Sequence, residues 1–100
     1  MPFDELTPRP FTVHSVRTFA PSTSGVYGIS NAREWLYVGE TPNIQAALLG
    51  HLQDLNTSLK KRQPTGFVFE VCDGASRSGR QDRLIHEYAP LFNPLSSRYS

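Results

Sequence analysis

The sequence is poor in the residues that build metal centres, disulfides and membrane spans. It has one cysteine, Cys72, which excludes an internal disulfide and a site made of several thiolates. Its histidines, His14, His51 and His86, are dispersed, which argues against a transition-metal site. No apolar run approaches the roughly 20 residues that span a bilayer, and the acidic, proline-rich N-terminus does not suit a secretory signal. We therefore expect a soluble, cytoplasmic protein that has no membrane segment and no resident metal or cofactor.

The sequence also lacks a large excess of either positive or negative charge. Ten Lys and Arg residues stand against nine Asp and Glu, which gives a formal net charge of +1. So small an excess argues against a strong long-range field acting on a polyanion. The positive residues gather in the second half of the chain and predict a local phosphate-facing patch; most of them are Lys60, Lys61, Arg62, Arg77, Arg80 and Arg83. The candidate nucleic-acid contacts among them are Lys60, Lys61, Arg62, Arg77 and Arg80.

One hundred residues, 38% of them hydrophobic, are the size of one small domain with a modest core. The pattern of β-formers predicts strands at 26–30, 35–39 and 67–72. One helix is expected to begin at Thr41-Pro42, and a second to run over 80–88 before Pro90. The apolar stripe of the first helix consists of Ile44, Leu48, Leu52, Leu55 and Leu59. This order predicts an α+β domain with helices packed on a small three-stranded sheet, antiparallel or mixed.

The N-terminal region gives weaker signals. Prolines in residues 1–10 indicate an extended segment, and residues 11–19 are rich in β-formers that alternate imperfectly. We expect 11–19 to form a weak strand or an extended lead-in. The domain organisation predicted from these patterns is an extended arm over 1–23, a folded domain over 24–93 and a tail over 94–100.

Two tyrosine triplets ten residues apart stand out, Gly25-Val26-Tyr27 and Tyr37-Val38-Gly39. Asn43-Ile44 follows the second triplet, and Leu84 to Asn93 closes with Pro-Leu-Phe-Asn. In this order, the motifs of residues 24–93 resemble the GIY-YIG nuclease superfamily. The resemblance implies a small α+β domain with a three-stranded, mainly antiparallel sheet flanked by helices.

The resemblance also implies a set of site residues. In active members, two tyrosines lie near the attacking water and the scissile phosphate, an arginine on the first helix holds the phosphate, and a glutamate on the second helix binds one divalent metal. Tyr27 and Tyr37 match the tyrosines, and His51 falls where members commonly carry Tyr or His. These three are the candidate catalytic residues, and Asn93 matches the closing asparagine as a candidate nucleic-acid contact.

Three positions depart from the family pattern. Ala47 stands at the arginine position, Gln81 at the metal-binding glutamate position, and Glu40 where a lysine is frequent. We expect Gln81 to face the sheet and Asp82 to turn toward solvent, since each helical residue rotates by about 100°. A glutamine brings no charge to a hard divalent ion, and losing one transition-state donor typically costs about 10²–10³ in rate. These departures argue against useful hydrolysis.

Three functions remain open from the sequence. The first is a catalytically inactive GIY-YIG nuclease-like domain retained for binding nucleic acid, such as DNA, or a protein partner. The second is a DNA endonuclease dependent on a divalent metal such as Mg²⁺, with Glu40 or Glu70 as a relocated ligand. The third is a protein-interaction module with no nucleic-acid role, which the near-neutral charge would suit.

Purely structural roles also stay open. Tyr27 and Tyr37 can be packed strand aromatics, and His51 can serve the core rather than a proton transfer. Lys60-Lys61-Arg62 can be a solvated helix end. Cys72 is interpreted as a small buried hydrophobe rather than a nucleophile.

Overall fold

The structure is a computed structural model that describes residues 8–53 and 63–90. In these ranges the chain forms four strands and three helices. In chain order they are β1 (Arg9–Pro10), α1 (Val13–Phe19), β2 (Gly25–Ser30), β3 (Trp35–Thr41), α2 (Ile44–Gln53), β4 (Gly66–Val71) and α4 (Arg77–Tyr88). Several predicted residues lie outside the described ranges, namely Leu55, Leu59, Lys60, Lys61, Arg62, Asn93 and the tail 94–100.

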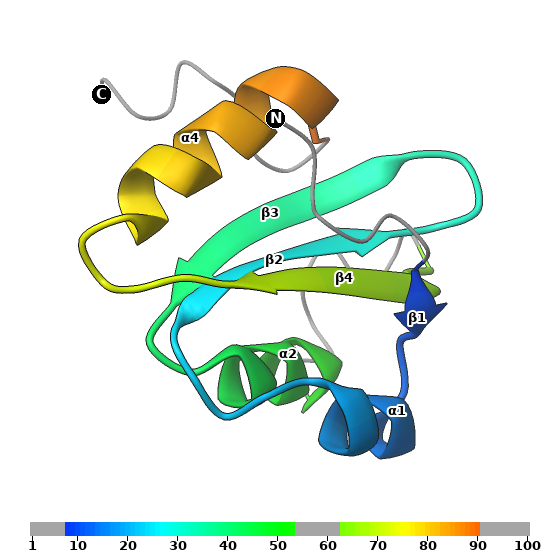
Figure 1. Cartoon of the computed structure of the whole chain (residues 1–100). Coiled ribbons are helices and arrows are strands. Elements are labelled where there is room, and N and C mark those ends of the chain that lie inside the picture. The colour runs from blue at the N-terminus through cyan, green and yellow to red at the C-terminus, as the bar shows by residue number, and fades with distance from the viewer. Residues whose placement is uncertain (1–7, 54–62, 91–100) are drawn as a thin grey trace.

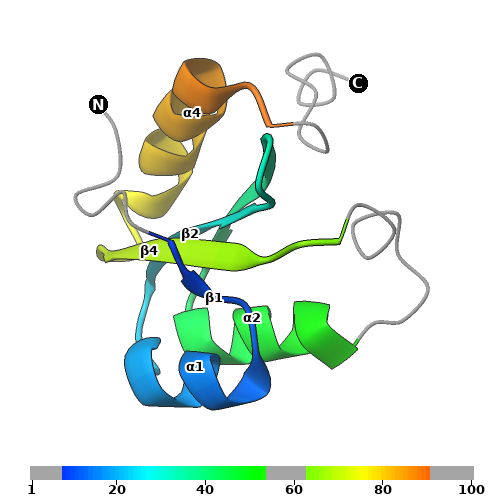
Figure 2. The same cartoon turned by 90° about the vertical axis from the view of Figure 1, so that its right-hand side faces the viewer.

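The strands form one antiparallel sheet in the order β1-β4-β2-β3. The α+β prediction is confirmed, and the short β1 adds a fourth strand to the three expected. Strand β2 lies between β4 and β3 and is buried along its whole length. Helices α1 and α2 cover one face of the sheet and α4 covers the other (Figures 1 and 2). No helix in the described part of the chain has the length and apolar character needed to cross a membrane.

The layered arrangement divides the core in two. Alternate residues of a strand point to opposite faces, so each face of the sheet has its own apolar cluster. The cluster beneath α1 and α2 contains Phe11, Val16, Ala20, Tyr27, Ile29, Leu36, Ile44, Leu48 and Phe67. The cluster beneath α4 contains Val26, Val38, Val68, Leu84 and Ile85. The central strand β2 contributes to both clusters, with Tyr27 and Ile29 on one face and Val26 on the other.

The expectation of a weak strand or extended lead-in over 11–19 is wrong, because residues 13–19 form helix α1. Thr12 caps this helix, since its side-chain oxygen accepts a hydrogen bond from Ser15 N at 3.1 Å. Val16 is fully buried in the core beneath the sheet. Packing of this helical face overrides the preference of the valine, threonine and phenylalanine side chains for strands.

Helix α2 begins two residues later than the sequence suggests. Thr41 belongs to β3, and its hydroxyl accepts a hydrogen bond from Asn43 N at 3.1 Å. The side chain of Asn43 then accepts from Ala46 N at 2.9 Å, which makes Asn43, not Thr41, the capping residue. The prediction of a cap at Thr41 is therefore wrong, although the predicted helix is present.

Helix α4 begins at Arg77, three residues before the expected start at residue 80. The Gly and Ser residues at 74–79 suggested a loop that reached to Gly79. The observed turn ends at Ser76, where Ser76 N donates to the Asp73 side chain at 2.9 Å. The early start places the Arg77 side chain on the helix rather than in a loop.

Candidate functional site

Tyr27, Tyr37 and His51 meet on the α2 face of the sheet, although they come from three different elements. The ring centroids of Tyr27 and Tyr37 are 6.0 Å apart, and the His51 ring lies 5.7 Å from Tyr27 and 5.3 Å from Tyr37. The Tyr27 hydroxyl and His51 Nε2 share a hydrogen bond of 2.9 Å. We call these three residues the tyrosine–histidine cluster.

Backbone register explains how Tyr27 reaches His51. Tyr27 of β2 lies directly opposite Gly39 of β3. A Cβ atom on residue 39 would stand 2.5 Å from the Tyr27 ring and hydroxyl, closer than real Cβ contacts occur. The phenol therefore crosses β3 through the space that glycine leaves open, and it continues to α2. The second triplet needs its glycine because the first triplet needs room for its tyrosine.

The two tyrosine side chains of the cluster differ in how far they are exposed to solvent. Tyr27 is 4% exposed, while Tyr37 and His51 are half-buried. Burial, and then the neighbouring Tyr37 hydroxyl, raise the pKa of Tyr27 well above its usual value. Tyr27 is thus a neutral phenol at neutral pH and cannot act there as a phenolate base. It can donate or accept a hydrogen bond.

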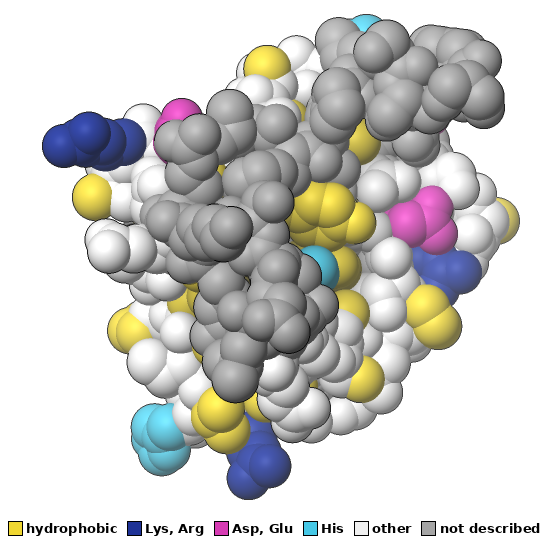
Figure 3. Space-filling model, turned by 180° about the vertical axis from the view of Figure 1, so that it is seen from behind, with side chains coloured by type: hydrophobic (Ala, Val, Ile, Leu, Met, Phe, Trp, Pro, Cys, Tyr) yellow, Lys and Arg dark blue, Asp and Glu magenta, His cyan; other side chains and the backbone are white. Residues whose placement is uncertain are grey.

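The surroundings of the cluster are apolar. Ala47, one turn before His51 on α2, is half-buried and packs against the core beneath the sheet. Seen from behind, the molecule shows hydrophobic side chains near the centre of this face and charged side chains toward its edges (Figure 3). Ala47 therefore presents to the cluster a methyl group that contributes to packing.

Gln81 lies on the other face of the sheet but contacts the same strand. Its side-chain Nε2 donates to the carbonyl oxygen of Val38 at 3.3 Å. Val38 is the residue between Tyr37 and Gly39, and β3 is an edge strand whose outer main-chain groups have no strand partner in the described sheet. Gln81 faces the sheet as the helical geometry predicted. Asp82, which was expected to turn toward solvent, is half-buried.

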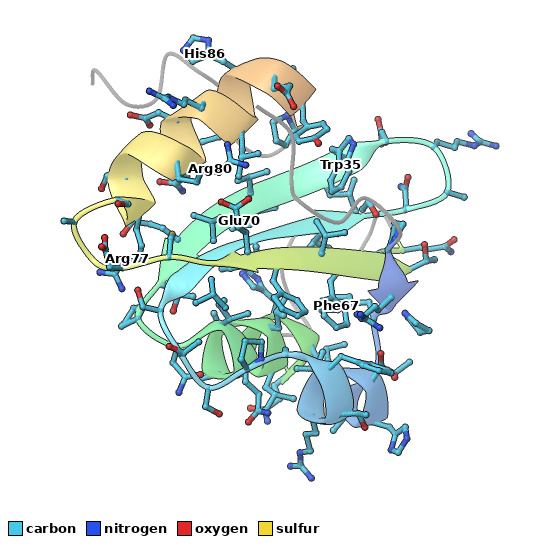
Figure 4. All side chains as sticks on the ribbon, in the orientation of Figure 1. Trp35, Phe67, Glu70, Arg77, Arg80 and His86 are labelled. Atoms are coloured by element: carbon cyan, nitrogen blue, oxygen red, sulfur yellow. The ribbon has the colours of Figure 1, made fainter. Side chains whose placement is uncertain are left out.

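The arginines of α4 contact carboxylates of the sheet. Arg80 holds Glu70 of β4 in a two-point contact, with Nε and a terminal nitrogen at 2.6 and 2.7 Å from the two carboxylate oxygens. Arg77 Nε lies 3.6 Å from Glu40 of β3, and the Ser78 hydroxyl donates to the same carboxylate at 2.7 Å. Figure 4 shows Arg80 and Glu70 facing one another between α4 and the sheet.

No family model and no curated protein matches the sequence. Among solved structures, the GIY-YIG N-terminal endonuclease domain of UvrC from Thermotoga maritima, bound to its catalytic divalent cation magnesium, is similar with a TM-score of 0.67 and 20% identity. The similarity covers 78% of this chain and 94% of that chain. This chain has a GIY-YIG-like fold.

A point mutant of the same UvrC domain, with a tyrosine changed to phenylalanine and its catalytic divalent cation bound, gives a TM-score of 0.66 at 20% identity over 78% of this chain and 93% of that chain. Mutants of three different tyrosines are similar to this chain, and those tyrosines are separated by ten and by fourteen residues. In the GIY-YIG-like fold described here, Tyr37 follows Tyr27 by ten residues and His51 follows Tyr37 by fourteen. The cluster thus repeats the spacing of those three tyrosines, with a histidine in the third place.

The side chains around α4 of this GIY-YIG-like fold do not fit a divalent metal. Gln81 directs its amide nitrogen, a donor, at the Val38 carbonyl, whereas a hard cation requires oxygen ligands. Glu40 and Glu70, the two relocated ligands considered from the sequence, both have arginine partners. The described residues contain no group of three or more His, Cys, Asp or Glu side chains that could hold a metal ion.

The GIY-YIG-like fold brings some predicted site residues together and separates others. The tyrosine–histidine cluster is assembled as the motifs suggested. Arg77 and Arg80, predicted as phosphate contacts, lie beside Glu40 and Glu70. Each of these pairs joins α4 to a strand, and no local pattern in the sequence predicts them.

Proposed function

We propose that this GIY-YIG-like domain binds nucleic acid without hydrolysing it. The observation that carries the proposal is the amide of Gln81 on the Val38 carbonyl, at the helix position where a metal-binding carboxylate would be needed. Ala47 supplies no guanidinium for a phosphate. The tyrosine–histidine cluster, by contrast, is intact and keeps two hydrogen-bonding rings at its surface.

Binding and hydrolysis place different demands on such a site. Hydrolysis of a phosphodiester requires a cation or several donors to offset the charge that develops on the phosphate oxygens. Binding requires only surface that bases or backbone can contact, such as half-buried Tyr37 and His51, together with a few cations. The cations that we propose for contacts with the nucleic-acid backbone are Lys60, Lys61 and Arg62, which lie outside the described residues.

The first experiment separates the enzyme from the binding domain. We expect no nicking of supercoiled DNA in millimolar Mg²⁺ or Mn²⁺, and retention of short duplex or branched DNA that weakens as salt rises. The control is Tyr27→Phe, which removes one hydroxyl from the cluster. Cleavage by the unmodified chain that disappears in Tyr27→Phe would refute the proposal.

The second experiment restores the missing groups. In Gln81→Glu a carboxylate faces the Val38 carbonyl, and since neither oxygen can donate a hydrogen bond, a hard cation between them becomes favourable. We expect Gln81→Glu to bind Mg²⁺, and Ala47→Arg with Gln81→Glu to show weak DNA nicking. Mg²⁺ binding without any nicking by the double variant would count against the cluster as a nuclease remnant.

The near-neutral charge favours a second candidate, a protein-interaction module. The same binding assay distinguishes the two functions. Phosphate contacts are strong at about 50 mM salt. A complete lack of DNA retention under this condition would refute nucleic-acid binding and favour the protein-interaction module.

A further inference from the structure

Two carboxylates lie in one row on the α4 face of the sheet. Val26 of β2 pairs with Glu40 of β3 on one side and with Glu70 of β4 on the other. Residues directly opposite one another in an antiparallel sheet project from the same face, and neighbouring strands are about 4.8 Å apart. The two glutamates therefore flank the buried Val26 side chain on one face, about 10 Å apart at their Cα atoms. Such a row of acids under a helix requires positive charge.

Helix α4 supplies that charge from its first turn. Arg77 and Arg80 are three residues apart and so lie on the same side of the helix. Arg80 contacts both oxygens of Glu70, with only 15% and 14% of the two side chains exposed. Arg77 Nε lies 3.6 Å from the Glu40 carboxylate, an ion-pair contact in which Nε makes no hydrogen bond. The Glu40 carboxylate accepts a hydrogen bond from the Ser78 hydroxyl. We call Arg77, Arg80, Glu40 and Glu70 the guanidinium clamp.

The clamp engages the carboxylates that a metal would need. A planar guanidinium on both oxygens of a carboxylate is a strong, directional contact, and a divalent ion would have to displace it. Gln81, which follows Arg80 directly, holds the edge of β3 through a neutral amide. The first turn of α4 thus joins β4 through Arg80 and β3 through Arg77, Ser78 and Gln81.

We propose that the guanidinium clamp joins α4 to the sheet and engages Glu40 and Glu70 as ion-pair partners, so that these two carboxylates do not bind Mg²⁺. Arg77 and Arg80 are then docking residues, not phosphate ligands. This inference holds whether or not the domain binds nucleic acid, and its test involves no DNA.

The test compares thermal unfolding in EDTA and in millimolar Mg²⁺. A ligand that binds the folded state raises Tm, and we expect the unmodified chain to show equal Tm values in both conditions. Arg80→Met releases the Glu70 carboxylate. We expect its Tm to fall by about 10 °C or more in EDTA, and Mg²⁺ to recover part of that loss, because two carboxylates then lack one of their cations.

Arg83→Met is the matched control, since Arg83 is exposed on the same helix. We expect its Tm to stay within about 2 °C of the original value, with no response to Mg²⁺. If Arg80→Met does not fold, Arg77→Met offers the same comparison at the longer contact with Glu40. A Tm of the unmodified chain that rises with Mg²⁺ would overturn the proposal. So would an arginine variant of the clamp that behaves like Arg83→Met.

Discussion

Replacing Gly39 with alanine places a methyl group where the Tyr27 ring now lies. The new Cβ would stand 2.5 Å from the ring carbon that bears the hydroxyl, 2.5 Å from the hydroxyl oxygen and 2.8 Å from a neighbouring ring carbon. Tyr27 has a strand on each side, since it pairs with buried Gly39 and with half-buried Phe69. The ring therefore has to move, and it then loses its 2.9 Å hydrogen bond to His51.

The expected loss follows from these two effects. Overpacking a core position typically costs about 1–3 kcal/mol, and a lost hydrogen bond about 1 kcal/mol. We expect Gly39→Ala to lower the free energy of unfolding by about 2–4 kcal/mol, which lowers Tm by roughly 10–25 °C in a domain of this size. Urea unfolding followed by Trp35 fluorescence measures the loss, because Trp35 lies against Tyr88 with ring centroids 4.6 Å apart.

Gly50→Ala is the matched control. Gly50 is exposed on α2, and a Cβ there meets no atom within 4 Å. Alanine is favoured over glycine inside a helix by about 0.5–1 kcal/mol, so this variant should gain stability. Both variants restrict the unfolded chain in the same way, which leaves contact with Tyr27 as their main difference.

A double variant tests the mechanism. Tyr27→Phe and Gly39→Ala both disrupt the bond to His51, so their combined loss should be smaller than the sum of the two single losses. Equal stabilities of Gly39→Ala and Gly50→Ala would refute the steric argument. Strict additivity in the double variant would refute the link to His51.

Two further predictions concern the turn before α4. The Ser76 hydrogen bonds lower the pKa of Asp73, so this carboxylate stabilises the fold above the unfolded-state pKa, and the contribution disappears as pH falls through the acid range below about 4. In Asp73→Asn, the free energy of unfolding should therefore decline less with falling pH than in the original chain. Urea titration at several pH values measures this decline. An equal decline in the two chains would contradict the prediction. The pKa of the Cys72 thiol is raised by burial and then by the carboxylates of Glu70 and Asp73. Alkylation of Cys72 near neutral pH should therefore be slower than that of free cysteine. An equal or faster rate would contradict the inference.

The three residues of the tyrosine–histidine cluster were predicted as a set only from the resemblance to the GIY-YIG superfamily. Tyr27 and Gly39 belong to triplets whose spacing sets the register of a hairpin, and His51 lies on the helix that follows. Antiparallel pairing of adjacent strands then brings Tyr27 and Tyr37 together. Strand pairing thus explains why the two tyrosines meet, while the choice of His51 rested on the resemblance alone.

Helix α1 could not be predicted in the same way. The helix contains Val13, Val16 and Phe19, whose side chains favour strands, and the contact of Val16 with the core and the Thr12 cap favour the helix instead. The guanidinium clamp was also missed, because Arg77 and Glu40 are distant in sequence. The start of α4 was placed too late for the same reason, since the turn that contains Gly79 owes its helical form to contacts made with other strands.

The two prolines that flank Arg9 affect how readily molecules of this protein associate through the edge of the sheet. Phe11 N donates to Thr65 O, and Arg9 pairs with Phe67, so the odd residues of this segment direct their main-chain groups at β4. Pro8 and Pro10 are then the residues turned toward the outside, and neither has an N–H to offer. A strand from another molecule finds few donors along this border of the sheet. Substituting alanine for both prolines would supply those donors and make the chain more prone to self-association and fibril growth.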